Sequence, residues 1–324
     1  VKGNEEFVTI GYIGDVSLAD NWDIMPYYES RNQGIYGILD ENMVSYMKDL
    51  NWLIANSEFA FGTNGTPMAN KLYTFLADPD HVSIYQEMGV DMVTLANNHV
   101  YDYGHDAFVS TLKTLKENSL PYIGAGNNIE EAASAHYLII NGYKISFLNA
   151  TRAEKYIMTP GATETTEGVF RAYDPSLLVQ RIKEEKQRSD YVVVLIHWGT
   201  ENSHELEDVQ METGRLYIDS GADMVVGTHA HVLQGMEFYK GKLIAYNLGN
   251  FIFNDQTVDT GILSFQLYDD GSSEFYFYPA LQKNCYTSSL EKDDQLNLYQ
   301  KMTDWSINVS FLEDGKIVEK ENSK

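Results

Sequence analysis

The apolar stretch at residues 191–196, YVVVLI, limits the possible folds of this chain more than any other segment. An unbroken apolar, mostly β-branched run predicts a strand buried on both faces, because a strand with one face in water alternates apolar and polar residues. Such strands are typical of parallel sheets that helices cover on both sides. The run ends directly at His197, so we expect an α/β fold that gathers function at its strand ends.

The same order of β-rich run, polar tip and helix recurs along the chain. Strands are expected at residues 7–13, 52–58 and 92–95, and each ends on a polar group or just before one. A loop is expected at 21–36, and helices at 37–50, 79–88, 106–118, 175–188 and 206–219. Hairpins are expected at the turns 141–142, 240–241, 269–271 and 313–315. With no repeat or linker in sight, we expect one domain over 1–324, with core motifs at 7–254 and a β-rich extension at 255–324.

Charge and cysteine content limit the partners and the chemistry. Lys and Arg number 23 against 47 Asp and Glu, a formal charge of −24, which argues against nucleic acid and suits cation binding. The single cysteine, Cys285, allows neither an intrachain disulfide nor a thiolate metal site. No apolar run is long enough to cross a bilayer. The chain opens without an initiator Met, which fits either a shortened chain or a mature form that has lost a targeting segment. On the second interpretation we expect a protein outside the cell or at its surface, where a lipid could anchor it.

His229 and His231 flank one alanine after the apolar residues 224–226. In extended chain, residues two apart point to the same face, so both imidazoles can aim at a common point. Ring nitrogens presented this way are a frequent means of holding a metal ion. The alternative is a satisfied polar pair at a strand end.

Oxygen or imidazole donors follow all of these strands: Asp15, Glu58, Asn98, His99, His197, His229 and His231. Taken singly, each has a simpler interpretation. Asp15 could cap a helix or form a turn, Glu58 could be a solvated carboxylate, and Asn98 a turn former; His197 could be a hydrogen-bonded core residue. Together they predict a two-metal hydrolytic site, which needs carboxylate, amide and imidazole ligands from separate strand ends.

The motifs that carry these residues resemble a known family. GDVSLAD, NSEFAF, LANNHVYDYG, IHWGTE and GADMVVGTHAHVLQGMEFYKGKLIAYNLGNFIF are similar, in order, to the capsule-synthesis (CapA, poly-γ-glutamate biosynthesis) family within the calcineurin-like metallophosphoesterases. The resemblance covers residues 7–253. It implies a four-layer α-β-β-α sandwich with mixed sheets, here followed by antiparallel C-terminal hairpins.

The resemblance also implies roles for single residues. Glu58 would take the place of the bridging aspartate; Asn98, His197 and His229 would complete one metal, and Asp15 and His231 would serve the other. His99 would be a general acid or an anion clamp, and Glu201 a supporting residue of the site. The chain has Ser17 where the superfamily has a metal-binding histidine, which weakens the Asp15 site. Oxygen and nitrogen ligands favour up to two divalent ions, Mn, Fe or Zn.

Three functions remain open from the sequence. The first is a cell-surface protein of capsule or poly-γ-glutamate production that acts through its metal site on the anionic polymer or an intermediate. In one version of this hypothesis, a membrane-embedded synthesis complex is its partner. The second is a metal-dependent phosphoesterase of a small anionic substrate. The third is a polymer-binding scaffold without catalysis, which Ser17 favours.

Overall fold

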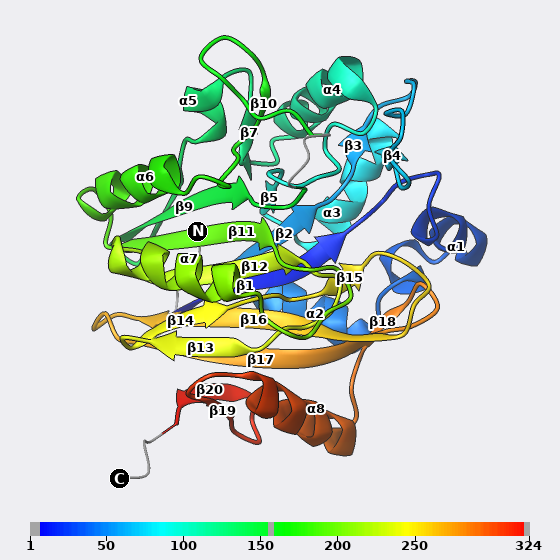
Figure 1. The fold of residues 1–324 in the computed structure, drawn as a ribbon. Helices are drawn as coiled ribbons and strands as arrows, with labels where there is room; N and C mark the ends of the chain where they lie inside the picture. Colours follow the sequence, from blue (N-terminus) through cyan, green and yellow to red (C-terminus); the bar gives the residue numbers. More distant parts are fainter. Residues whose placement is uncertain (1–6, 155–158, 321–324) are drawn as a thin grey trace.

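Two mixed sheets form the centre of the computed structural model, which describes residues 7–154 and 159–320 (Figure 1). In the described residues the larger sheet has the order β19-β20-β17-β16-β1-β2-β5-β6, with β15 beside β1 and β18 beside β17. Its strands are β1 (Phe7–Val16), β2 (Trp52–Ser57), β5 (Met92–Thr94), β6 (Tyr122–Ile123), β15 (Asn250–Ile252), β16 (Val258–Tyr268), β17 (Ser273–Gln282), β18 (Thr287–Ser289), β19 (Val309–Phe311) and β20 (Lys316–Glu319).

The smaller sheet has the order β13-β14-β12-β11-β9-β8. Its strands are β8 (His136–Ile140), β9 (Tyr143–Thr151), β11 (Tyr191–Trp198), β12 (Met224–His229), β13 (Met236–Tyr239) and β14 (Lys242–Ala245). Two further pairs lie outside these sheets: β3 (Ala60–Phe61) with β4 (Leu76–Ala77), and β7 (Ala125–Gly126) with β10 (Gly168–Val169).

Helices cover the outer faces of both sheets (Figure 1). One apolar cluster joins the larger sheet to α1 (Ile24–Arg31), α2 (Glu41–Asp49), α3 (Val82–Met88) and α4 (Gly104–Glu117). Another joins the smaller sheet to α5 (Ile129–Ala132), α6 (Ser176–Lys186) and α7 (Asp208–Asp219). A third fills the space between the sheets. The expected four-layer α-β-β-α sandwich is therefore confirmed.

The apolar strand that sets the fold is buried on both faces, as predicted. Val192, Val194 and Ile196 of β11 belong to the cluster under the helices, whereas Val193 and Leu195 belong to the cluster between the sheets. Strands buried on both faces are typical of parallel sheets; here helices cover one face of β11 and the larger sheet covers the other. In the structure β11 runs parallel to both β9 and β12.

Two parts of the chain differ from expectation. Residues 21–36 were predicted to be a loop but contain α1, which buries only Ile24 and Met25 and so lacks a repeating apolar stripe. The tail was predicted to be β-rich with antiparallel hairpins, and the hairpins β16-β17 and β19-β20 confirm this, but the unforeseen helix α8 (Lys292–Trp305) lies between them. Its buried residues, Leu298, Tyr299 and Met302, have helical spacing that the neighbouring turn signals obscured.

One glycine fixes the end of β1 against the chain that precedes β15. A Cβ atom on Gly14 would lie 1.9 Å from the carbonyl oxygen of Gly249, so only glycine fits there. The next residue, Asp15, donates its amide to that same carbonyl at 2.9 Å. The close approach therefore sets the position of the Asp15 carboxylate.

Within residues 7–154 and 159–320, every helix is too short or too polar to cross a bilayer.

Candidate metal centre

The predicted site residues converge at the carboxyl ends of strands from both sheets. Asp15 lies in β1, Glu58 directly follows β2, and Asn98 and His99 lie in the loop after β5. His197 lies in β11 and His229 ends β12. Because β1, β2 and β5 are parallel, as are β11 and β12, their carboxyl ends share one edge in each sheet. The two edges meet at one place between the sheets.

Three groups of side chains each bring carboxylate oxygens and ring nitrogens within 4.8 Å of one another: Glu58, His197 and His229; Asp15, Glu58 and His231; and Glu201, His229 and His231. Glu58 belongs to the first two groups, which makes it the residue that two neighbouring cations would share. Asn98 lies beside the first group, because its Oδ1 is 2.8 Å from His197 Nε2. Glu201 is exposed, at the outer edge of the site.

Buried polar atoms without partners show that the residues present fit a cation. Glu58 Oε1 is buried and has no hydrogen-bond partner among the described residues. Around it lie His197 Nε2 at 3.6 Å, His231 Nε2 at 3.8 Å and His99 Nε2 at 3.9 Å. The Nδ1 atom of His229 is likewise buried and unpartnered in the described part of the chain. Such orphaned acceptors are rare in folded proteins, and a divalent cation would satisfy them.

Burial sets the protonation of the histidines. Burial, with repulsion from neighbouring histidines, lowers the pKa of His197 well below its usual range and that of His229 to about 3. Both rings are therefore neutral and present nitrogen lone pairs. Burial also works against the charged form of His231, but its hydrogen bond with Asp15 and the charge of that carboxylate raise the pKa of His231.

The two carboxylates of the centre have opposite shifts. Burial and the nearby charge of Asp15 raise the pKa of Glu58 well above its usual range. Burial acts in the same sense on Asp15, but its hydrogen bond with His231 and the charge of that ring leave its pKa lowered. Bringing two buried carboxylates together is unfavourable without compensating positive charge. The arrangement therefore suits bound cations.

The backbone around His229 and His231 differs from the predicted extended chain. The residues have φ angles of 101° and 60°, so the strand ends at His229 and the chain turns. The expectation that both imidazoles share one face because they are two apart in a strand is therefore wrong. The rings still meet, with centroids 6.0 Å apart, through a backbone that non-glycine residues seldom adopt. Such unfavourable φ angles persist where the surrounding structure holds the residue in place, and they are frequent at functional sites.

Asn56, which the sequence analysis did not select, connects the site internally. Its Nδ2 lies 2.8 Å from Asp15 Oδ1, 3.1 Å from Glu58 Oε2 and 3.4 Å from His197 Nδ1. Its Oδ1 in turn accepts a hydrogen bond from Thr94 Oγ1 at 3.0 Å. The amide thus fixes both carboxylates. It lies two residues before Glu58, in the motif NSEFAF, which is the signal that could have revealed it.

A second unforeseen group supports His99 from behind. Asp102 Oδ2 lies 2.7 Å from His99 Nδ1, and Asp102 Oδ1 lies 2.7 Å from Lys71 Nζ. Lys71 also contacts Glu154 Oε1 at 3.3 Å and donates to the carbonyl of Asn98. The side chains of Lys71 and Asp102 are 5% and 0% exposed. Asp102 lies three residues after His99 in the motif LANNHVYDYG, but nothing in the sequence marks Lys71 as its partner.

Ser17, which replaces the histidine expected from the superfamily pattern, is buried, and its hydroxyl has no partner among the described residues. The second cation group therefore depends on Asp15, Glu58 and His231.

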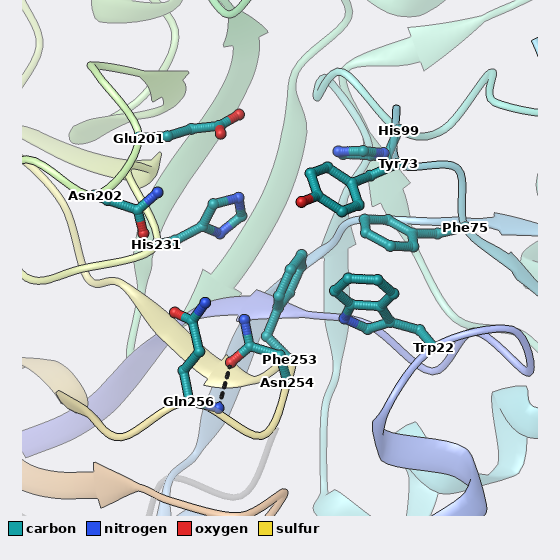
Figure 2. A pocket seen from close by; sticks show the side chains of 10 residues that line it. All are labelled: Trp22, Tyr73, Phe75, His99, Glu201, Asn202, His231, Phe253, Asn254 and Gln256. Carbon is teal, nitrogen blue, oxygen red and sulfur yellow. Dashed lines mark hydrogen bonds between the residues drawn. The ribbon is translucent and has the colours of Figure 1, made fainter. Parts of the chain in front are cut away.

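A pocket of about 130 Å³ opens beside the centre (Figure 2). His99, Glu201 and His231 line the side of the pocket that faces the centre, and aromatic and amide side chains form the rest. A ligand in the pocket would therefore contact the candidate metal centre directly.

Comparison with known proteins identifies relatives of this chain. The chain is 31% identical over 283 residues to "PGA biosynthesis protein CapA" of Bacillus subtilis, a match that covers 86% of this chain and 70% of the relative. It is 32% identical over 246 residues to "Capsule biosynthesis protein CapA" of Bacillus anthracis, covering 72% of this chain and 58% of the relative. The chain thus spans between about half and three quarters of these proteins.

Solved structures share the fold. A novel phosphatase of Mycoplasma pneumoniae superposes with a TM-score of 0.53 at 14% identity, covering 86% of this chain and 95% of the phosphatase. A proposed 5′-nucleotidase of Staphylococcus aureus gives 0.51 at 17% identity, covering 92% of this chain and 58% of the other. The family model for the bacterial capsule synthesis protein PGA_cap matches residues 9–255. The chain therefore belongs to this bacterial capsule synthesis family, on a metallophosphoesterase-like fold.

Proposed function

We propose that this protein acts in bacterial capsule or poly-γ-glutamate production as a metal-dependent hydrolase of an anionic polymer or of an intermediate in its synthesis. The observation that carries the proposal is the meeting of Glu58 with three histidine rings around one unpartnered, fully buried carboxylate oxygen. A buried carboxylate oxygen without a partner is unfavourable, and a bound cation would satisfy it. The names of the two relatives, which mention PGA and capsule biosynthesis, support the biological setting.

Two groups of ligands would hold the cations. Glu58, His197 and His229, with Asn98 beside them, would hold one divalent ion, and Asp15, Glu58 and His231 the other. When bound, such ions supply an activated water nucleophile and stabilise negative charge on the substrate. Nitrogen and oxygen ligands favour Mn, Fe or Zn. Asn56 holds both carboxylates in position, because it donates to Asp15 and to Glu58.

His99 is the residue that we propose to act on substrate protons. Its Nδ1 faces Asp102 at 2.7 Å, so the proton on that atom is held by the carboxylate and Nε2 faces the centre. Burial lowers the pKa of His99, with Asp102 opposing this shift, so the resting ring is neutral. Nε2 would take up a proton from solvent and give it to the leaving group, which is the general-acid role that the resemblance implies, and Asp102 would stabilise the charged ring in between. Glu201, at the exposed edge, would contact the substrate or support the second cation.

The proposed setting is the cell envelope. Capsule polymers are assembled at the cell surface, so we propose an envelope location, with lipid anchoring as one means of attachment and the membrane-embedded synthesis machinery as a partner. The chain has a formal charge of −24, so it would repel a polyanion unless bound cations offset that charge. A single globular domain over the whole chain also remains our proposal.

The test separates metal binding from turnover. The full chain would be stripped with a chelator, reloaded with Mn²⁺ or Zn²⁺, and assayed for bound metal by atomic emission and for hydrolysis of 4-nitrophenyl phosphate. We expect Glu58→Gln to lose metal and activity together. His99→Ala should keep its metal but lose at least ~100-fold in turnover, the typical contribution of a general acid or base.

The matched control is His105→Ala, because His105 is 66% exposed on α4 and its side chain pairs with Glu167, away from the centre. It should change neither quantity. A His99→Ala variant as active as the control would remove His99 from the reaction, and a stripped protein that takes up no metal would remove the hydrolase proposal altogether.

A polymer-binding scaffold is the second candidate, and one observation favours it. The unpartnered hydroxyl of Ser17 stands where the superfamily has a metal-binding histidine, so one cation group has fewer strong ligands. A scaffold would bind γ-linked oligoglutamate equally well before and after chelation. Binding that requires the metal would count against it.

A further inference from the structure

The pocket next to the metal centre has an aromatic wall built from separate segments (Figure 2). Trp22, Tyr73, Phe75 and Phe253 form it. The rings contact one another in series: Trp22 to Tyr73 at 5.6 Å, Trp22 to Phe75 at 4.9 Å, and Phe75 to Phe253 at 5.6 Å between centroids. The wall thus runs as one surface from the centre toward solvent.

This wall begins at the candidate centre itself. Phe75 lies 4.4 Å from the ring of His99, and Phe253 lies 4.6 Å from the ring of His231. Its outer end is Tyr73, which is 52% exposed. A ligand with one group at the metal centre would therefore place its next group on the aromatic rings.

Polar groups face the aromatic wall. The side chains of Asn202, Asn254 and Gln256 line the opposite and lower sides of the pocket in Figure 2. The indole N–H of Trp22 is buried and has no hydrogen-bond partner within the described residues. In Figure 2 the edge of the indole that carries this nitrogen faces Phe253 and Asn254. Asn254 Oδ1 already accepts hydrogen bonds from Gln256 N and Gln282 Nε2, and the indole N–H is closed to solvent. The amides of Asn202 and Gln256 are exposed, so they can pair with hydroxyls on a ligand.

Positive side chains are missing from the lining. Among the described residues that line the pocket, none is Lys or Arg, and Glu201 adds a negative charge. Lys71, which lies nearby, is buried between Asp102 and Glu154 and so is already paired. A polymer with a carboxylate on every unit would have no counter-charge beyond the metal centre and would be repelled.

We infer that this pocket binds one uncharged sugar ring of a ligand whose single anionic group, such as a phosphate, lies at the metal centre. A sugar presents C–H groups on its face to the aromatic wall and hydroxyls on its edge to the amides of Asn202 and Gln256. The inference rests on the proposed function and narrows it: the substrate is a sugar-phosphate-like intermediate or chain end, not the interior of a polycarboxylate.

The experiment measures binding to the full-length Mn²⁺-loaded protein by calorimetry, with glucose 1-phosphate, inorganic phosphate, phenyl phosphate and a γ-linked pentaglutamate as probes. We expect glucose 1-phosphate to bind ~5- to 10-fold tighter than inorganic phosphate, the gain of one ring stacked on aromatics. Tyr73→Ala and Trp22→Ala should remove this gain and leave the affinity for inorganic phosphate unchanged. Tyr73 is exposed, so its variant tests the pocket even if the Trp22 variant folds poorly.

The control is Tyr137→Ala, because Tyr137 is 39% exposed on β8. This variant should keep the full gain in affinity for glucose 1-phosphate over inorganic phosphate. Two results would overturn the inference: a pentaglutamate that binds more tightly than glucose 1-phosphate and depends on Tyr73, or phenyl phosphate that gains more than the sugar phosphate.

A separate arm keeps the inference apart from the proposed function. In chelated protein, methyl glucoside should quench the Trp22 fluorescence, seen as the difference between the parent and Trp22→Phe. If inorganic phosphate shows no metal-dependent binding while this quenching persists, the proposed hydrolase fails and the ring pocket stands. If quenching is absent, the ring pocket fails, whatever the phosphate results.

Discussion

The buried lysine behind the metal centre allows a quantitative prediction about stability. Lys71 Nζ lies 2.7 Å from Asp102 Oδ1 and 3.3 Å from Glu154 Oε1, and the Lys71 side chain is only 5% exposed. Lys71→Met keeps the aliphatic length but removes the charge. Asp102, which is 0% exposed, would then be a buried carboxylate without its cation.

Breaking such a pair from one side costs about 3–5 kcal/mol, because the remaining charge stays desolvated. We expect Lys71→Met to lose roughly that much free energy of unfolding, measured by urea denaturation of the metal-free full chain with circular dichroism. The matched control is Lys301→Met. Its Nζ lies at a similar distance, 2.8 Å, from Asp259 Oδ2, but the Lys301 side chain is 53% exposed.

Exposed pairs contribute only about 0–1 kcal/mol. If Lys71→Met costs no more than Lys301→Met at an unchanged denaturant slope, then Asp102 does not depend on Lys71 and the proposed support of His99 is wrong. A double variant with Asp102→Asn should recover part of the loss, because it removes the stranded charge.

Three further predictions concern the rest of the account. Glu58→Gln should raise the stability of the metal-free chain, because it removes a buried carboxylate whose pKa is raised by burial and by the charge of Asp15. The same variant should abolish the stabilisation that Mn²⁺ gives the parent, which is about 2.7 kcal/mol at 100 times Kd. Thermal scans with and without Mn²⁺ check both effects. Gly14→Ala should cost at least ~2 kcal/mol and lower metal affinity, because its Cβ would lie 1.9 Å from the Gly249 carbonyl; a variant with parental stability and metal binding would contradict that packing. We also expect a single unfolding transition, because β16 of the C-terminal part pairs with β1, from Phe7 opposite Tyr268 to Tyr12 opposite Leu263. Different urea midpoints from fluorescence and from circular dichroism would argue for separate units.

The sequence predicted the fold well where a pattern is set by two-sided burial. The run at 191–196 is apolar because both faces of β11 are covered, and that requirement is visible in the residues themselves. The helix α1 was missed because it buries only two side chains near its start, and a helix that contributes so little to the core leaves no period to detect.

The candidate site was predictable for a similar reason. Donor residues directly follow strands, so their chemistry and place in the chain appear together, and the structure brings Asp15, Glu58, His197, His229 and His231 into overlapping groups. How they meet was not predictable. The positive φ angles at His229 and His231 arise from tertiary contacts that an alternation rule does not contain.

The supporting residues were least visible. Lys71 lies 31 positions before Asp102, and an ordinary surface loop would give the same sequence around it. Only the folded chain shows that it is buried against two carboxylates. Long-range ion pairs of this kind leave no local pattern in the sequence.

The most direct test of the account is anomalous scattering from a crystal of the protein grown with Mn²⁺. We predict a peak within about 2.0–2.4 Å of Glu58 Oε1 and of ring nitrogens from His197 and His229, with a second, weaker peak beside Asp15 and His231. A data set without a peak near Glu58, or with its only peak elsewhere on the protein, would contradict the central claim that these strand ends form a metal centre.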